Sequence, residues 1–212
     1  MNISNTYLIS LSSLATLTFI LTIFFTPLLR RYALKKGIVD YPDNIVKKHT
    51  EIKPYLGGVA IFFAFFFAVL IVSLISINNY IPQITLNFKQ LVVIWQIFFC
   101  STIIMLLGLI DDIKNLSPYI KLIVQFIVAL IIIRYDIQIQ IKFLPDIINE
   151  ILTVIWIVTM TNAANLIDIM DGLCAGVTGI AALTFIIAGL ITNNPIVTIL
   201  SCAVCGGCLG FL

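Results

Sequence analysis

The chain has 212 residues, of which 61% are hydrophobic and only 10% carry a charge. Soluble domains carry about 25% charged residues, so this composition and a mean hydropathy of +1.14 exclude a water-soluble globular protein. A net charge of +2 is too small to indicate a nucleic-acid partner. We therefore predict an all-α, polytopic membrane helix bundle, with residues 1–212 forming a single integral membrane domain.

Seven apolar runs are predicted to be transmembrane helices, because a helix needs about 20 apolar residues to cross a bilayer. They cover residues 7–29, 57–77, 91–110, 119–135, 150–164, 177–192 and 196–212. Nine of the twelve basic residues then fall in loops on one side, seven of them between 30 and 56. The positive-inside rule assigns that side to the cytoplasm and places the N-terminus outside.

Two other patterns in the predicted spans and loops indicate structure and no chemistry. The stretch 137–142 alternates apolar and polar residues, which favours a short extracytoplasmic β-hairpin or an interfacial segment. Cys202, Cys205 and Cys208 have a metal-like spacing, but they lie in an apolar run with glycines and no nearby histidine. We interpret them as part of a small-residue helix face.

The first polar cluster is the basic loop before the second span. It contains Lys47, Lys48, His49 and Lys53. Basic side chains at a membrane surface attract anionic headgroups and phosphates. Considered alone, the loop is better explained by charge that only sets the topology.

The second polar cluster lies between the third and fourth predicted spans. Asp111 and Asp112 are adjacent at the end of one span, and Lys121 lies at the start of the next. Mg²⁺ takes oxygen ligands and usually reaches a phosphate through one or two carboxylates, while a lysine contacts phosphate as a point charge. The alternative is an ordinary turn with capping residues.

The third polar cluster follows the fifth predicted span. Asn162, Asn165, Asp168 and Asp171 recur at steps of three, so a helix that continued through them would present neighbouring members on one flank. Carboxylates beside hydrocarbon are costly and usually mark a site or a water-filled cavity. A solvated helix end is the alternative.

All three clusters are predicted to lie at span edges on the cytoplasmic side. A transporter is expected to hold its carboxylates near mid-membrane. Edge placement instead favours a surface site where a soluble phosphate compound meets a lipid. Several carboxylates and lysines together favour metal-assisted phosphoryl transfer there.

Three motifs resemble those of the polyprenyl-phosphate N-acetylhexosamine-1-phosphate transferases, membrane enzymes that start cell-wall and surface-glycan lipid intermediates. The motifs are KKHTEIKPYLGG at 47–58, GLIDDIKNLSPYIKLIVQF at 108–126 and NAANLIDIMDGLCAG at 162–176. The resemblance extends over essentially the whole chain. It implies a multi-pass protein of the inner (plasma) membrane, in which undecaprenyl phosphate attacks the β-phosphorus of a UDP-N-acetylhexosamine on the cytoplasmic face and UMP leaves.

The resemblance also implies roles for individual residues. The paired aspartates Asp111 and Asp112 would be catalytic, Asp111 as a base or as a group that orients the lipid phosphate. Mg²⁺, or Mn²⁺ as an alternative, would bind Asp112 and Asp168. The substrate-binding residues would be Lys48, His49, Lys121, Asn165 and Asp171. A homodimer is a further expectation.

The chain departs from the family pattern at two points. Ile169 follows Asp168 where the family usually has glycine, and a branched side chain there would crowd a nucleotide. Family members also have more spans, so we expect this chain to correspond to the N-terminal portion of a longer fold. The alternatives are an inactive truncated relative that binds lipid phosphate or a partner, and a small membrane transporter.

Overall fold

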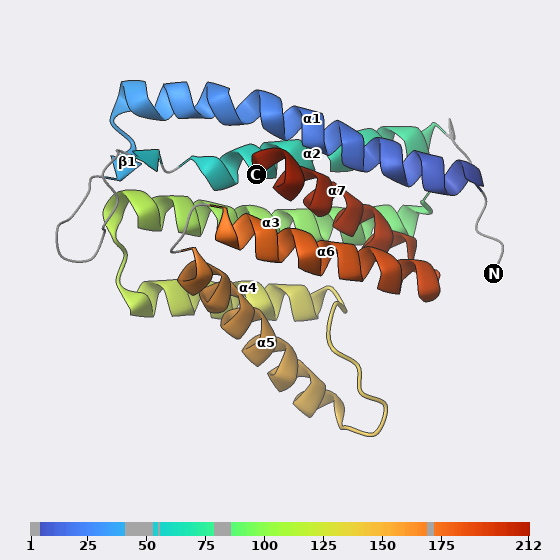
Figure 1. Cartoon of the computed structure of the whole chain (residues 1–212). Helices are drawn as coiled ribbons and strands as arrows, with labels where there is room; N and C mark the ends of the chain where they lie inside the picture. Colours follow the sequence, from blue (N-terminus) through green and yellow to red (C-terminus); the bar gives the residue numbers. More distant parts are fainter. Residues whose placement is uncertain (1–4, 41–52, 55, 79–85, 169–171) are drawn as a thin grey trace. The chain divides into compact units, whose positions relative to one another are not determined.

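The computed structural model describes residues 5–40, 53–54, 56–78, 86–168 and 172–212, and these residues are almost entirely helical (Figure 1). They divide into two units, one made of residues 1–87 and 175–212 and the other of residues 88–174. Within these described residues, five helices are long and apolar enough to cross a membrane. The predicted all-α, polytopic membrane bundle is thus confirmed.

The first unit contains the N-terminal and C-terminal helices. Its elements are α1 (Asn5–Lys36), β1 (Val39–Asp40), β2 (Lys53–Pro54), α2 (Gly57–Ile77), α6 (Leu173–Ile191, from residue 175 onward) and α7 (Pro195–Phe211). The two strands are only two residues long and pair antiparallel, with Val39 opposite Pro54. Helices α1, α2 and α7 pack against one another.

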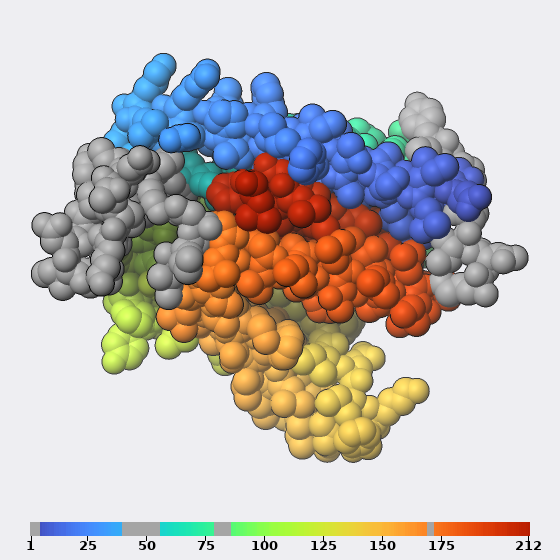
Figure 2. Space-filling view, viewed as in Figure 1, coloured from blue at the N-terminus to red at the C-terminus, as the bar shows by residue number. Residues whose placement is uncertain are grey.

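Helix α7 buries several small residues against its neighbouring helices. Cys202, Cys205 and Cys208 are at most 4% exposed, as the prediction of a small-residue face requires. At Gly206 a β-carbon would collide with the hydroxyl oxygen of Thr18 and the carbonyl oxygen of Ala15. In the space-filling view the atoms of α7 (red) lie directly against those of α1 (blue) (Figure 2). Glycine therefore permits the close approach of these two helices.

The second unit is a three-helix arrangement. Its helices are α3 (Phe88–Lys114), α4 (Pro118–Arg134) and α5 (Asp146–Ile167). Helix α4 packs on both α3 and α5, and α5 runs obliquely to α4 (Figure 1). Ser117 caps the N-terminus of α4 and Pro118 occupies its first turn, which is the arrangement that favours a sharp helix start.

Of the two alternatives predicted for the segment 136–149, the β-hairpin is wrong. Residues 137–142, all of which the structure describes, contain no strand, and Lys142 already lies in a turn. The backbone N–H of Ile139 donates to Thr153 Oγ1 at 3.0 Å, and that of Ile141 donates to Asn149 Oδ1 at 3.2 Å. The side chains of Asn149 and Thr153, one turn apart on α5, thus accept hydrogen bonds from backbone N–H groups that strand pairing in a hairpin would have used.

Candidate active site at the α3–α4 turn

The α3–α4 turn is organised by the side chain and backbone of Asp111. Helix α3 ends at Lys114, and Asn115 adopts a positive φ of 48° that reverses the chain. The N–H of Asn115 donates to the carbonyl oxygen of Asp111 at 2.7 Å, and the N–H of Leu116 donates to Asp111 Oδ1 at 3.0 Å. Asp111 is therefore held at a fixed position by the turn that follows it.

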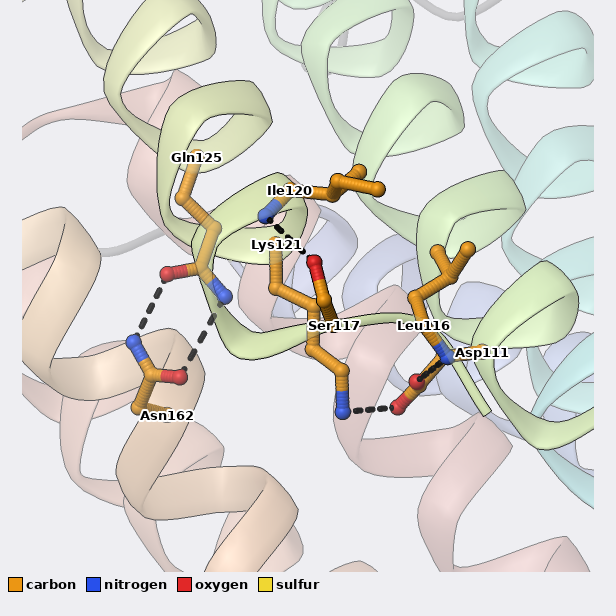
Figure 3. A network of polar contacts seen from close by, with 7 residues as sticks. All are labelled: Asp111, Leu116, Ser117, Ile120, Lys121, Gln125 and Asn162. Carbon is orange, nitrogen blue, oxygen red and sulfur yellow. Dashed lines mark hydrogen bonds and ion pairs between the residues drawn. The ribbon is translucent and has the colours of Figure 1, made fainter. Parts of the chain in front are cut away.

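The second carboxylate oxygen of Asp111 forms an ion pair across this turn. Lys121 Nζ lies 2.5 Å from Asp111 Oδ2, and the two side chains are 24% and 15% exposed (Figure 3). Partial burial makes such a pair stronger than an ion pair in open solvent. The structure thus brings together two of the predicted site residues from different helices.

A shallow apolar groove of about 340 Å³ is formed by residues of α4 and α5. It is lined by Leu122, Ile123, Phe126, Ile127 and Val158. The lining residues on α4 form two adjacent pairs, Leu122 with Ile123 and Phe126 with Ile127. The pairs are four positions apart, so they lie one above the other on the same face of the helix. The groove lining on α4 starts one residue after Lys121 in the sequence, and it is compatible with hydrocarbon.

One turn further along α4, Gln125 forms a pair with Asn162 of α5. Asn162 Nδ2 donates to Gln125 Oε1 at 2.7 Å, and Gln125 Nε2 donates to Asn162 Oδ1 at 3.5 Å (Figure 3). Sequence reasoning singled out Asn162 but missed Gln125. A carboxamide inside an apolar span, four residues after Lys121, was the signal that could have found it.

The structure shows where α5 ends relative to the third polar cluster. The helix does not continue through the polar residues at steps of three; it ends at Ile167, and Asp168 is the C-cap residue with φ −77° and ψ 48°. Asn162 and Asn165 lie within the helix, whereas Asp168 follows it. Asn165 and Asp168 are both exposed. A carboxylate beside the negative end of a helix dipole favours a nearby cation.

Several predicted site residues lie outside the described part of the chain. These are Lys48, His49 and Asp171, together with the departure at Ile169. Asp112 is described and is exposed in the last turn of α3. Within the described ranges no group of three histidine, cysteine, aspartate or glutamate residues could hold a metal ion. The carboxylates of Asp112 and Asp168 have the oxygen chemistry that Mg²⁺ prefers, but phosphate oxygens would have to complete its coordination.

These features define a class: a multi-pass helical membrane protein with a carboxylate–lysine pair at one end of its helices. Residues 94–212, more than half of the chain, match the sequence profile of glycosyl transferase family 4. The chain belongs to this family, and the predicted family is confirmed.

Relatives in several bacteria support the assignment. The chain is 34% identical over 195 residues to a probable undecaprenyl-phosphate N-acetylglucosaminyl 1-phosphate transferase of Bacillus subtilis, covering 88% of this chain and 50% of the relative. It is 31% identical over 182 residues to an undecaprenyl-phosphate alpha-N-acetylglucosaminyl 1-phosphate transferase of Thermotoga maritima, covering 82% and 54%. A decaprenyl-phosphate N-acetylglucosaminephosphotransferase of Mycolicibacterium smegmatis is 28% identical over 213 residues, covering 91% and 50%. The chain spans about half the length of these relatives.

Proposed function

We propose that this chain forms the phosphate-binding part of a membrane enzyme that transfers N-acetylhexosamine 1-phosphate from a UDP-sugar to polyprenyl phosphate. The active face would be the cytoplasmic face of the inner (plasma) membrane. The names of the relatives support the reaction and the lipid acceptor. The concentration of basic residues between 30 and 56 supports the sidedness through the positive-inside rule.

The observation that carries this proposal is the Asp111–Lys121 ion pair beside an apolar groove. Lys121 is a cation one residue before Leu122, where the apolar lining on α4 begins, and this combination suits a lipid whose head is a phosphate. Both oxygens of Asp111 are already engaged, one by the Leu116 N–H and one by Lys121. This arrangement suits a residue that orients Lys121 and the phosphate better than a general base, which needs an oxygen available to accept a proton.

In the proposed reaction an oxygen of the lipid phosphate attacks the β-phosphorus of the UDP-sugar. A new phosphorus–oxygen bond forms, the bond from the β-phosphorus to the bridging oxygen breaks, and UMP leaves. Lys121 holds the attacking phosphate while Asp111 fixes the lysine. Asp112 and Asp168 would hold Mg²⁺, which when bound neutralises charge on the diphosphate. The nucleotide would meet Asn165 at the end of α5.

The proposal is tested with membranes that contain the protein, undecaprenyl phosphate, Mg²⁺ and UDP-GlcNAc labelled in the sugar. We expect lipid-extractable label to form together with UMP. Lys121→Met should reduce the initial rate by about 100-fold or more, because it removes a positive charge that acts on the reacting phosphate. Lys142→Met is the matched control, since Lys142 is exposed in the loop at the other end of α4. An unchanged rate for Lys121→Met would exclude Lys121 from the reaction.

The sidedness is tested with sealed vesicles of known orientation. UDP-GlcNAc does not cross the bilayer unaided, so product should form only when the cytoplasmic face is accessible to it. Product from the opposite face would overturn the assignment. Movement of the sugar nucleotide into vesicles without UMP release would instead support a transporter.

A further inference from the structure

The Gln125–Asn162 pair is a directional contact in an otherwise apolar part of the α4–α5 interface. Gln125 is only 4% exposed, and its neighbours on the buried side of α4, Val128 and Ala129, are 1% and 0% exposed. Contacts between apolar side chains are non-directional, so they do not require particular atoms of the two helices to face each other. A buried amide pair, in contrast, requires its donors and acceptors to face each other.

The direction of this pair is fixed by a third partner. Asn162 Nδ2 also donates to the carbonyl oxygen of Val158 at 2.8 Å. A carbonyl oxygen only accepts, so the atom of Asn162 facing Val158 must be the nitrogen. That nitrogen also donates to Gln125 Oε1. Rotating the Gln125 amide by half a turn would place its nitrogen opposite the Asn162 nitrogen and its oxygen opposite the Asn162 oxygen. The pair therefore has one arrangement, which corresponds to one axial register of α4 against α5.

This register connects the two halves of the candidate site. Lys121 lies one turn before Gln125 on α4, and Asn165 lies one turn after Asn162 on α5. If α4 slid along α5, the distance between Lys121, which would contact the acceptor phosphate, and the residues at the end of α5 would change. Errors of about 1 Å in the placement of reacting groups reduce rates by as much as about 100-fold.

We propose that Gln125 and Asn162 are positioning residues that set the distance between the acceptor phosphate at Lys121 and the nucleotide end of the site at Asn165 and Asp168. This inference rests on the proposed function and adds to it a pair that contacts neither substrate. It gives a role to the two carboxamides in these apolar helices, where an apolar side chain would pack without needing a partner.

The test compares four variants with the unsubstituted full chain in the same membranes. Gln125→Leu and Asn162→Leu each remove the contact between the two amides. Asn162→Leu leaves the buried Gln125 amide without that partner, whereas in Gln125→Leu the Asn162 amide keeps its bond to the Val158 carbonyl. The third variant exchanges the two side chains, Gln125→Asn with Asn162→Gln, and keeps the summed length of the pair. The fourth, Thr153→Val, is the matched control: Thr153 is also 4% exposed and also accepts a hydrogen bond, but it lies toward the other end of α5.

We expect the two leucine variants to lower kcat at least about tenfold while the KM values for both substrates stay within about twofold, since geometry and not binding is lost. The exchanged pair should recover most of kcat. Thr153→Val should lower the apparent melting temperature and leave kcat unchanged, which separates positioning from simple destabilisation.

The outcomes distinguish this inference from the proposed function. An unsubstituted protein that forms no lipid product overturns the proposed function, and the positioning role with it. An active unsubstituted protein with unchanged kcat in Gln125→Leu overturns the positioning role alone. So does an equal loss of kcat in Thr153→Val, or an exchanged pair that recovers no activity.

Discussion

Lys121 Nζ and Asp111 Oδ2 lie 2.5 Å apart across the α3–α4 turn, while Asp111 Oδ1 accepts the backbone N–H of Leu116. One carboxylate thus shapes the turn and also fixes the lysine that follows it. The two roles use different oxygens of Asp111. This division allows a phosphate to compete for Lys121 without opening the turn, because the Leu116 contact does not depend on the ion pair.

The first prediction concerns Asp111→Asn. The amide oxygen of asparagine still accepts the Leu116 N–H, so the turn is kept, but the charge that orients Lys121 is lost. We expect the initial rate of the proposed transfer to fall by about 100-fold to 1,000-fold, as for the loss of other preorganised electrostatic groups. Lipid-extractable label from UDP-GlcNAc measures the rate.

Asp146→Asn is the control for that substitution. Asp146 is exposed in the first turn of α5, at the opposite end of that helix from Asp168. The same change of charge there should leave the rate within about twofold. Equal activity of the Asp111→Asn and unsubstituted proteins would show that the ion pair has no part in the reaction.

Most of the helical architecture could be predicted from hydropathy, because a membrane-spanning segment must satisfy its backbone hydrogen bonds internally. The predicted span 57–77 matches α2 at both ends. The span predicted at 7–29 continues to Lys36, and the run predicted to end at 110 continues to Lys114. Their ends are set by positive-φ residues, Gly37 and Asn115, and not by the last apolar residue.

The site was predictable where its residues are close in sequence and unpredictable where they are distant. Asp111 and Lys121 flank a short turn, so their encounter follows from two antiparallel helices. Gln125 and Asn162 are 37 positions apart, and no spacing rule relates them. Whether a helix continues through the polar residues at steps of three was a condition that the sequence left open, because their spacing does not show where a helix ends; α5 ends at Ile167.

The second prediction concerns the metal ion. Chelation by EDTA should abolish the proposed transfer, and Mg²⁺ should restore it. In Asp112→Asn the Mg²⁺ concentration for half-maximal rate should rise at least about tenfold, since a ligand oxygen with a full charge is replaced by a neutral one. A rate that is insensitive to EDTA would remove the metal from the proposal.

Asp136→Asn provides the comparison for Asp112→Asn. Asp136 has a positive φ of 58° and is exposed just after α4, at the end away from Lys121. Asparagine tolerates this backbone conformation well, so the fold should be kept. The Mg²⁺ titration of this variant should coincide with that of the unsubstituted protein, and a shift equal to that of Asp112→Asn would indicate a nonspecific effect of surface charge.

The third prediction concerns the start of α4. Ser117 Oγ accepts the N–H of Ile120, and Ser117→Ala leaves this donor without its side-chain partner. We expect a loss of about 1 kcal/mol in stability, which corresponds to a decrease of about 2–4 °C in the apparent melting temperature of a chain of this size. Ser117→Thr keeps an acceptor oxygen and should melt close to the unsubstituted protein. Equal melting of the alanine and threonine variants would show that the cap contributes nothing measurable.

The fourth prediction tests the contact between α1 and α7. At Gly206 an added β-carbon would overlap the carbonyl oxygen of Ala15, and the Ala15 backbone cannot move away without displacing α1. We expect Gly206→Ala to destabilise the protein by about 1–3 kcal/mol, the range for overpacking of a close contact. At Gly58 on α2 an added β-carbon meets nothing within 4 Å, so Gly58→Ala should be neutral or stabilising by up to about 1 kcal/mol. Thermal unfolding in detergent measures both variants, and an equally stable Gly206→Ala protein would show that α7 does not pack on α1 at this distance.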